Sequence, residues 1–177
     1  MAPRALAALL PMMLVACGRD APSPSPDPPR ASQAASRDGP PKAFGVEIVA
    51  APAEGAVQEI VRAEVVRTTH DGRQLLVYVG AKWCEPCRRF HEAAKAGKLD
   101  QAFPGLRLLE FDLDADRDRL IAAGYASRMI PLFALPRTDG MGSGDQIEGS
   151  IKGEGAVDQI SPRLTRLLAG GGGDPPR

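Results

Sequence analysis

The chain has 177 residues, including 17 prolines and 19 glycines. Lysine plus arginine and aspartate plus glutamate balance at 22 each, so there is no basic excess to bind a nucleic-acid backbone. Because the prolines and glycines gather near the two ends, we expect one ordered domain of about 125 residues between unstructured segments.

The amino-terminal segment has the layout of a secretory signal. One positive charge, Arg4, precedes an apolar run of about 12 residues, which is too short for the roughly 20 residues of a membrane span. The sequence Leu14-Val15-Ala16-Cys17 resembles the bacterial lipobox, which implies that Cys17 is lipidated and becomes the first residue after cleavage. Gly18, rather than an aspartate, follows the cysteine, and this favours the outer membrane. An ordinary signal peptide or a buried amphipathic start remain open alternatives.

A proline- and serine-rich stretch follows the signal segment. It has almost no large apolar side chain, so it cannot bury a core and stays disordered or polyproline-like, as a leash or a passive spacer. We therefore divide the chain into a signal peptide (1–16), a lipid-anchored cysteine with its linker (17–43), an ordered domain (44–169) and a disordered tail (170–177).

Hydrophobic periodicity predicts alternating strands and helices in the ordered domain. Strands are expected at residues 44–49, 74–80, 106–113, 130–135 and 146–151. Helices are expected at residues 56–69, 86–99, 116–123 and 156–169. Asp116 is the expected N-cap of the third helix, and Pro162 is expected to disturb the fourth. The order β-α-β-α-β-α-β-β-α indicates a mixed α/β domain.

The motif Trp83-Cys84-Glu85-Pro86-Cys87 lies where the second strand meets the second helix. Two cysteines at this spacing are typical of a redox pair or of half a zinc site. Ile130-Pro131 follows 44 residues after Cys87, and Glu148-Gly149 precedes the last helix. Together these features resemble the thioredoxin-fold family over residues 44–169.

This resemblance implies a thioredoxin fold, in which helices flank a central mixed β-sheet, and the activity of a protein-disulfide oxidoreductase that needs no cofactor. The Glu85-Pro86 dipeptide also resembles the membrane-tethered reductases of the TlpA/ResA group. That group carries an insert after the active-site helix, for which this chain is too short. The layout is more similar to plain thioredoxin or to the C-terminal periplasmic domain of DsbD-like proteins.

The resemblance also assigns roles to the residues of the motifs. Cys84, at a helix N-terminus that stabilises its thiolate, is the expected attacking sulfur. Cys87, one turn later and more buried, is the expected resolving sulfur. Trp83 shields the site and offers a flat contact for substrates. Pro131, if its peptide bond is cis, exposes the Ile130 backbone to an extended substrate peptide.

Two positions depart from the thioredoxin pattern. Thioredoxins carry a buried acid six residues before the first cysteine, where this chain has Tyr78, and a lysine in the next strand, where it has Glu110. Our hypothesis is that Glu110 replaces the acid as proton acceptor for Cys87, with Tyr78 hydrogen-bonded nearby. The alternative is that Glu110 is exposed on an edge strand.

The remaining charged residues near the motif bear on the direction of electron flow. A carboxylate at Glu85 opposes the Cys84 thiolate, which favours a reductant over an oxidant. His91 is expected to face solvent, and His70 to lie in a turn. A reductant in an oxidising compartment needs an electron donor, for which we expect a membrane thiol relay, and its substrates would be disulfide-containing proteins of the cell envelope.

Two other classes of function stay open at this point. One is a non-catalytic binding module that keeps the fold and an inert disulfide. The other is a copper chaperone that uses the cysteine pair, which is disfavoured because no methionine or histidine lies beside it. Neither a metal site nor binding to nucleic acid is predicted.

Overall fold

The computed structural model describes residues 44–170. The predicted signal peptide, the lipidation of Cys17, the whole linker and most of the tail lie outside these residues. Strands are β1 (Glu47–Ala50), β2 (Gln74–Gly80), β3 (Leu106–Asp112), β4 (Leu132–Pro136) and β5 (Gly142–Glu148). Helices are α1 (Val57–His70), α2 (Glu85–Lys95), α3 (Leu113–Ala122) and α4 (Ala156–Leu168). The predicted order of elements is confirmed.

The strands form one mixed sheet in the order β1-β3-β2-β4-β5. Strands β1, β3 and β2 are parallel, while β4 runs antiparallel to β2 and β5 antiparallel to β4. The central strand β2 is buried from Leu75 to Gly80, as its uninterrupted apolar run predicts for a strand that is covered on both faces. Its carboxyl end leads directly to the cysteine motif, so the motif rests on the most buried strand.

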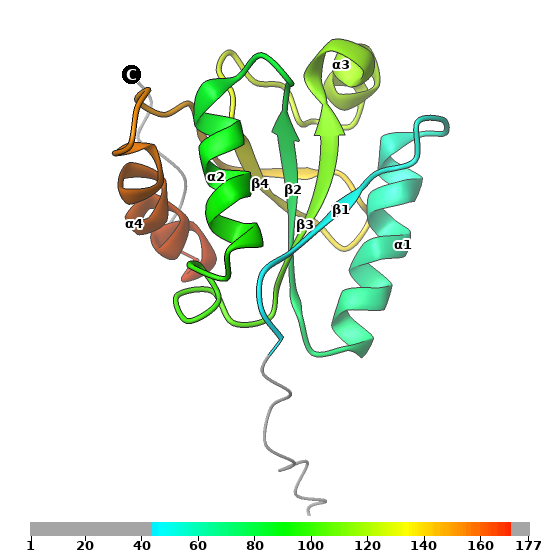
Figure 1. Cartoon of the computed structure of the whole chain (residues 1–177). Helices are drawn as coiled ribbons and strands as arrows, with labels where there is room; N and C mark the ends of the chain where they lie inside the picture. Colours follow the sequence, from blue (N-terminus) through cyan, green and yellow to red (C-terminus); the bar gives the residue numbers. More distant parts are fainter. Residues whose placement is uncertain (1–43, 171–177) are drawn as a thin grey trace, which may run out of the picture. The chain divides into compact units, whose positions relative to one another are not determined.

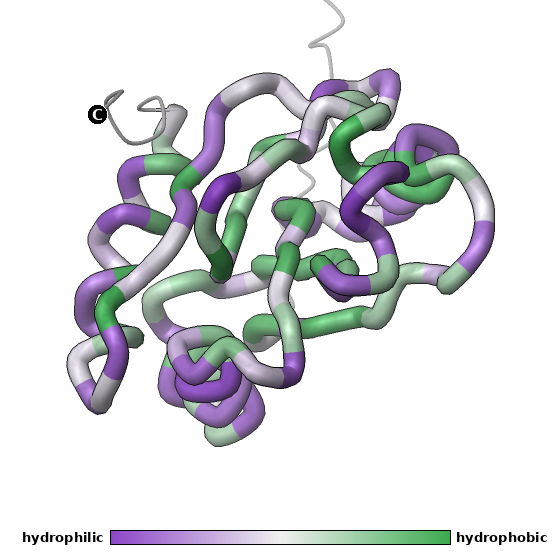
Figure 2. Tube along the Cα trace, turned by 90° about the horizontal axis from the view of Figure 1, so that it is seen from above, coloured by the Kyte–Doolittle hydropathy of each residue, from purple (hydrophilic) through white to green (hydrophobic). Residues whose placement is uncertain are grey.

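Helices cover both faces of the sheet (Figure 1). Side chains of α2 and α4, such as Phe90 and Ile160, share one core cluster with the sheet, whereas those of α1 and α3, such as Val61 and Leu120, share the other. Figure 2 shows the most hydrophobic stretches running through the interior of the trace. Between residues 44 and 170, no helix is both long and apolar enough to cross a bilayer.

Helix α3 begins three residues before the position predicted from Asp116. The cap is Asp112, whose carboxylate accepts a hydrogen bond from the backbone N–H of Asp114 at 2.9 Å. Asp116 reaches back and accepts from the backbone N–H of Asp112 at 3.0 Å. Both aspartates therefore satisfy N–H groups at the start of the helix, and the prediction of Asp116 as the cap was wrong.

The bounds of β5 also differ from the prediction. The strand occupies Gly142–Glu148 rather than residues 146–151, and most of its first half is exposed. It forms an edge of the sheet, where half of the side chains need no apolar partner, so the hydrophobic pattern gave no signal. Helix α4 continues through Pro162, and α2 ends at Lys95 rather than at residue 99.

Candidate redox site

The cysteine pair lies at the N-terminus of α2. Cys84 has extended backbone angles and is the N-cap, and its Sγ accepts a hydrogen bond from the backbone N–H of Cys87 at 3.2 Å. Pro86 occupies the first turn, where its missing N–H costs no hydrogen bond. The two sulfurs are joined in a disulfide. After reduction, the same N–H and the helix dipole would stabilise a thiolate on Cys84.

Both cysteines are almost inaccessible in this oxidised state. Cys84 is 4% exposed and Cys87 is 3% exposed, so the expected difference in burial between them is absent. The chemical asymmetry comes from position instead. Cys84 precedes the helix and faces its free N–H groups, whereas Cys87 lies one turn inside and also borders a cavity that residues of α2 and α3 line.

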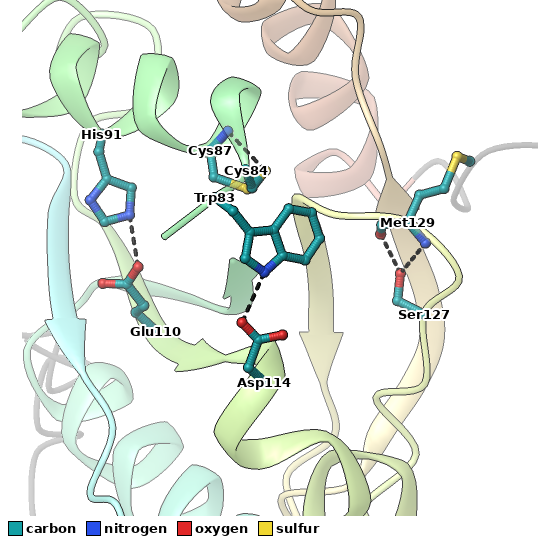
Figure 3. Close-up of a disulfide and its surroundings, with 8 residues drawn as sticks. All are labelled: Trp83, Cys84, Cys87, His91, Glu110, Asp114, Ser127 and Met129. Atoms are coloured by element: carbon teal, nitrogen blue, oxygen red, sulfur yellow. Dashed lines mark hydrogen bonds and ion pairs between the residues drawn. A yellow bond between two sulfur atoms is a disulfide. The ribbon is translucent and has the colours of Figure 1, made fainter. Parts of the chain in front are cut away.

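Trp83 is exposed beside the disulfide, with 66% of its surface accessible. Its indole Nε1–H donates to the Asp114 carboxylate at 2.8 Å (Figure 3). Asp114 belongs to the first turn of α3, and so this bond holds the ring at the mouth of the site while leaving its face open. Sequence reasoning missed Asp114, since nothing local links it to a tryptophan that lies 31 positions earlier.

The loop before β4 also borders the site, since Ile130 packs against the core cluster that contains both cysteines. The Ile130–Pro131 peptide bond is cis, and the Pro131 carbonyl accepts a hydrogen bond from the backbone N–H of Gly149 at 2.9 Å. Gly149 has a φ of 68°, which explains a glycine before the last helix. Met129, directly before this dipeptide, is 43% exposed, so an apolar surface is accessible on this side too.

The Glu85 carboxylate is bound by the loop before α4 and by a side chain of its own helix. It accepts hydrogen bonds from the backbone N–H of Gly153 at 3.0 and 3.2 Å, and it pairs with Arg89 at 3.3 Å. The Gly153 N–H holds the pKa of Glu85 below its usual range, and Arg89 adds to this effect against partial burial. Glu85 is therefore ionised at neutral pH, but part of its charge is compensated, which weakens the expected effect on Cys84.

Glu110 is neither the buried acid nor the exposed edge residue that the sequence allowed. It lies on the interior strand β3, its side chain is 31% exposed, and its carboxylate is 2.8 Å from Nε2 of His91. His91 is 22% exposed, so the prediction that it faces solvent was wrong. His70 ends α1 as an exposed residue beside Asp71.

Tyr78 does not make the hydrogen bond that the sequence suggested. Its side chain is fully buried, and its hydroxyl has no hydrogen-bond partner among the described residues. Burial raises the pKa of Tyr78 well above its usual value, and the nearby Glu110 carboxylate raises it further. The phenol therefore stays protonated and neutral, so it can donate a proton but does not take one up.

Sheet order and site geometry together identify the architecture. Three parallel strands, β1, β3 and β2, continue into the antiparallel β4 and β5, with helices on both faces. The disulfide lies at the N-terminus of the helix that follows the central strand, and Pro131 precedes the next strand in the sheet. The chain has the thioredoxin fold.

Comparison with solved structures returns thioredoxins. A thioredoxin h from poplar is 19% identical, with a TM-score of 0.41, and the match covers 70% of this chain and 96% of that one. A thioredoxin from Trichomonas vaginalis is 20% identical, with a TM-score of 0.41, and the match covers 69% and 96%. A variant thioredoxin from Halobacterium salinarum is 18% identical, with the same TM-score and coverage of 73% and 95%. No family model and no curated protein sequence matches the chain.

Among residues 44–170 of this thioredoxin fold, no three histidine, cysteine, aspartate or glutamate side chains are arranged to hold a metal ion. The two cysteines instead form the disulfide.

Glu148 fixes the loop that carries the Ile130-Pro131 dipeptide. Its carboxylate accepts hydrogen bonds from the Ser127 hydroxyl at 2.7 Å and from the backbone N–H of Arg128 at 3.0 Å. Burial alone would raise the pKa of Glu148, but the bonds from Ser127 and from the backbone outweigh it and hold the pKa below its usual range. The carboxylate thus stabilises the folded loop in its ionised form.

We expect Glu148→Gln to lower the free energy of unfolding by about 1 kcal/mol at neutral pH, because an amide accepts these bonds less strongly. Since the folded-state pKa lies below the unfolded one, the stabilisation is complete above the usual glutamate pKa and is lost as the pH falls through the lowered value. Urea unfolding of both proteins across the acid range measures the difference, with the exposed Glu154→Gln as control. A difference that grew on acidification would contradict this role.

Proposed function

We propose that this protein is a thiol:disulfide oxidoreductase that exchanges the Cys84–Cys87 pair with disulfides of protein substrates. The observation that carries the proposal is a disulfide at the N-terminus of α2, beside an exposed tryptophan, with Ile130 of the cis-proline dipeptide packed against the core cluster that contains both cysteines. A helix N-terminus lowers the free energy of a thiolate, which is the form that attacks a disulfide. Exposed apolar groups around it give a substrate chain a surface to contact.

The reaction of the reduced protein has two exchange steps. The Cys84 thiolate attacks one sulfur of the substrate disulfide, and the other substrate sulfur leaves as a thiolate. The Cys87 thiolate then attacks Cys84 Sγ, which re-forms the intramolecular disulfide and releases the second substrate sulfur. The substrate gains two electrons and the protein loses two, so an external dithiol must reduce the pair before the next cycle.

We further propose that the protein acts as a reductant. Glu85 is ionised at neutral pH, and a negative charge next to Cys84 makes the dithiol less favourable relative to the disulfide. Arg89 and Gly153 compensate part of that charge, so the contribution is modest. A membrane thiol relay, like the one that would serve a DsbD-like C-terminal domain, is the proposed electron donor, and disulfide-containing envelope proteins are the proposed substrates.

The experiment that tests this function combines turnover with a reduction potential. The protein should accelerate insulin-disulfide reduction by dithiothreitol, and equilibration with a thiol couple should give a potential near the −270 mV of thioredoxin rather than the −120 mV of a strong oxidant. A reduction potential near that of the strong oxidant would contradict the proposal that the protein acts as a reductant. Insulin reduction no faster than with dithiothreitol alone would instead indicate a binding module with an inert disulfide.

We also propose that Cys17 carries a lipid that anchors the protein in the cell envelope, with the outer membrane favoured. This proposal comes from the lipobox-like residues before Cys17 and concerns a segment outside the described residues. The full-length protein should incorporate a radiolabelled fatty acid and sediment with membranes, and Cys17→Ser should lose the label and the sedimentation together. A Cys17→Ser protein that still sediments with membranes would contradict lipid anchoring at this residue.

A further inference from the structure

A cavity of about 630 Å³ opens beside Cys87. It is lined by residues of both α2 and α3, next to the carboxyl ends of β1 and β3, and alanines such as Ala51 and Ala115 form part of its wall. Cys87, His91 and Glu110 all line it. The cavity has room for several water molecules and offers them polar partners, so Cys87 has a route for a proton that does not cross the substrate face.

His91 lies on the same helix as Cys87 and contacts the carboxylate of Glu110. His91 follows Cys87 by four residues on α2, which places both on the same face of the helix. Its Nε2 is 2.8 Å from the Glu110 carboxylate (Figure 3), and its ring centroid is 5.4 Å from that of Tyr78. A carboxylate in this arrangement orients an imidazole.

Tyr78 is the buried neighbour of both His91 and Glu110. It pairs with Glu110 in the register of β2 and β3, so both side chains project from the same face of the sheet. The hydroxyl lies so close to Gly80 that a Cβ at that glycine would be 3.0 Å from the oxygen. Because this phenol remains protonated, it cannot accept the proton, whereas the pair formed by His91 and Glu110 can.

The second exchange step creates the need for such a group. Cys87 is 3% exposed, and a thiol that is held away from water ionises poorly without a base nearby. Yet Cys87 must be a thiolate when it attacks Cys84 Sγ. The first step does not share this requirement, since Cys84 is served by the helix N-terminus.

We propose that the pair of His91 and Glu110 takes up the Cys87 proton during release of the substrate, with His91 as the base and Glu110 as its positioning partner. The proton passes through water in the cavity to the imidazole. The Cys87 thiolate forms the bond to Cys84, and the bond between Cys84 and the substrate sulfur breaks. The substrate sulfur leaves as a thiolate and takes a proton from solvent, and the pair returns its own proton through the open side of the cavity. This inference rests on the proposed function.

Other titratable and charged groups also surround the cavity. The groups that face it from the packed elements are Lys82 before α2, Arg88, Glu92 and Lys95 on α2, Tyr78 on β2, Glu110 and Asp112 on β3, and Asp116 on α3. Positive and negative charges are nearly balanced in this set. The direct contact with Glu110 is therefore the interaction that distinguishes His91 from a surface histidine.

The test separates the two exchange steps with an aromatic disulfide whose thiol product absorbs light. Reduced protein releases one equivalent of the coloured thiol when Cys84 attacks and a second when Cys87 resolves the adduct. We expect His91→Gln to slow the second phase by roughly ten- to a hundred-fold at neutral pH, to change the first phase by less than about two-fold, and to rejoin the wild type at high pH. Glu110→Gln should slow the same phase.

The chain offers a matched control in His70, the only other histidine, which is exposed at the end of α1. His70→Gln should leave both phases unchanged. In His91→Ala, free imidazole should restore the second phase, because the enlarged cavity can admit it, and unfolding curves will show that each variant is folded. The inference is overturned if the second phase keeps its rate and pH profile in His91→Gln, or if imidazole has no effect on a slowed His91→Ala. Failure of the proposed function itself would appear separately, as wild-type protein that does not turn over insulin.

Discussion

Replacing Cys84 by serine should reduce insulin-disulfide turnover to the background rate, a loss on the order of 10³-fold or more, because the attacking atom is removed. Replacing Cys87 should give a different result. Cys87→Ser keeps the nucleophile at the N-terminus of α2 but cannot resolve the adduct, so protein substrates should accumulate as mixed disulfides through Cys84. Non-reducing gels and mass spectrometry of adducts measure both outcomes, and dithiothreitol should release the trapped partners.

The double variant with serine at both positions is the matched control for this experiment. It lacks the disulfide, as both single variants do, so it corrects for any loss of stability from the missing cross-link. It should trap nothing. Turnover that survives in Cys84→Ser, or adducts found on Cys87 in that variant, would show that the two sulfurs do not have the separate roles that their positions on α2 indicate.

Replacing Phe90 by alanine should give the largest loss of stability among the residues behind the site. Phe90 is completely buried on α2, and its ring centroid lies 4.8 Å from that of Phe133 and 6.2 Å from that of Tyr78. Removing such a side chain costs about 3–5 kcal/mol, which corresponds to a fall in Tm of roughly 10–20 °C for a domain of this size. Thermal and urea unfolding of the oxidised protein measure it.

A surface control distinguishes this loss from a general effect of shortening a side chain. Val66 on α1 is 66% exposed, and Val66→Ala should change the free energy of unfolding by less than about 0.5 kcal/mol. Phe90→Leu keeps most of the apolar volume and should cost less than the alanine variant. If Phe90→Ala lost under 1 kcal/mol, the packing of α2 on the sheet would not depend on this aromatic contact in the way described.

Local sequence patterns predicted the order of the elements and the class of the fold. The apolar run at 74–80 specified a strand that is buried on both faces, and β2 has those bounds. The cysteine motif with Pro86 indicated a helix N-terminus, and α2 begins there. These features could be predicted because each depends on residues within one or two helical turns or along a single strand.

The edge of the sheet and the caps were harder to predict for the same reason. The polar first half of β5 becomes a strand because it pairs with β4, for example Gly142 with Pro136. The residues of β5 themselves have no pattern from which this pairing could be predicted. At the start of α3, three nearby aspartates were all possible N-caps. The point at which the backbone becomes helical makes Asp112 the cap.

The sequence by itself therefore determined that this chain places Cys84 and Cys87 at the start of a helix in a mixed α/β domain. The tertiary structure decided what surrounds them. It joined Glu110 to His91, turned Glu85 toward Gly153, and tied Trp83 to Asp114. Each of these contacts joins residues from different elements, between 19 and 68 positions apart. A charge at such a position has no fixed partner until the sheet and helices have packed, and so its chemical role could not be predicted from the sequence alone.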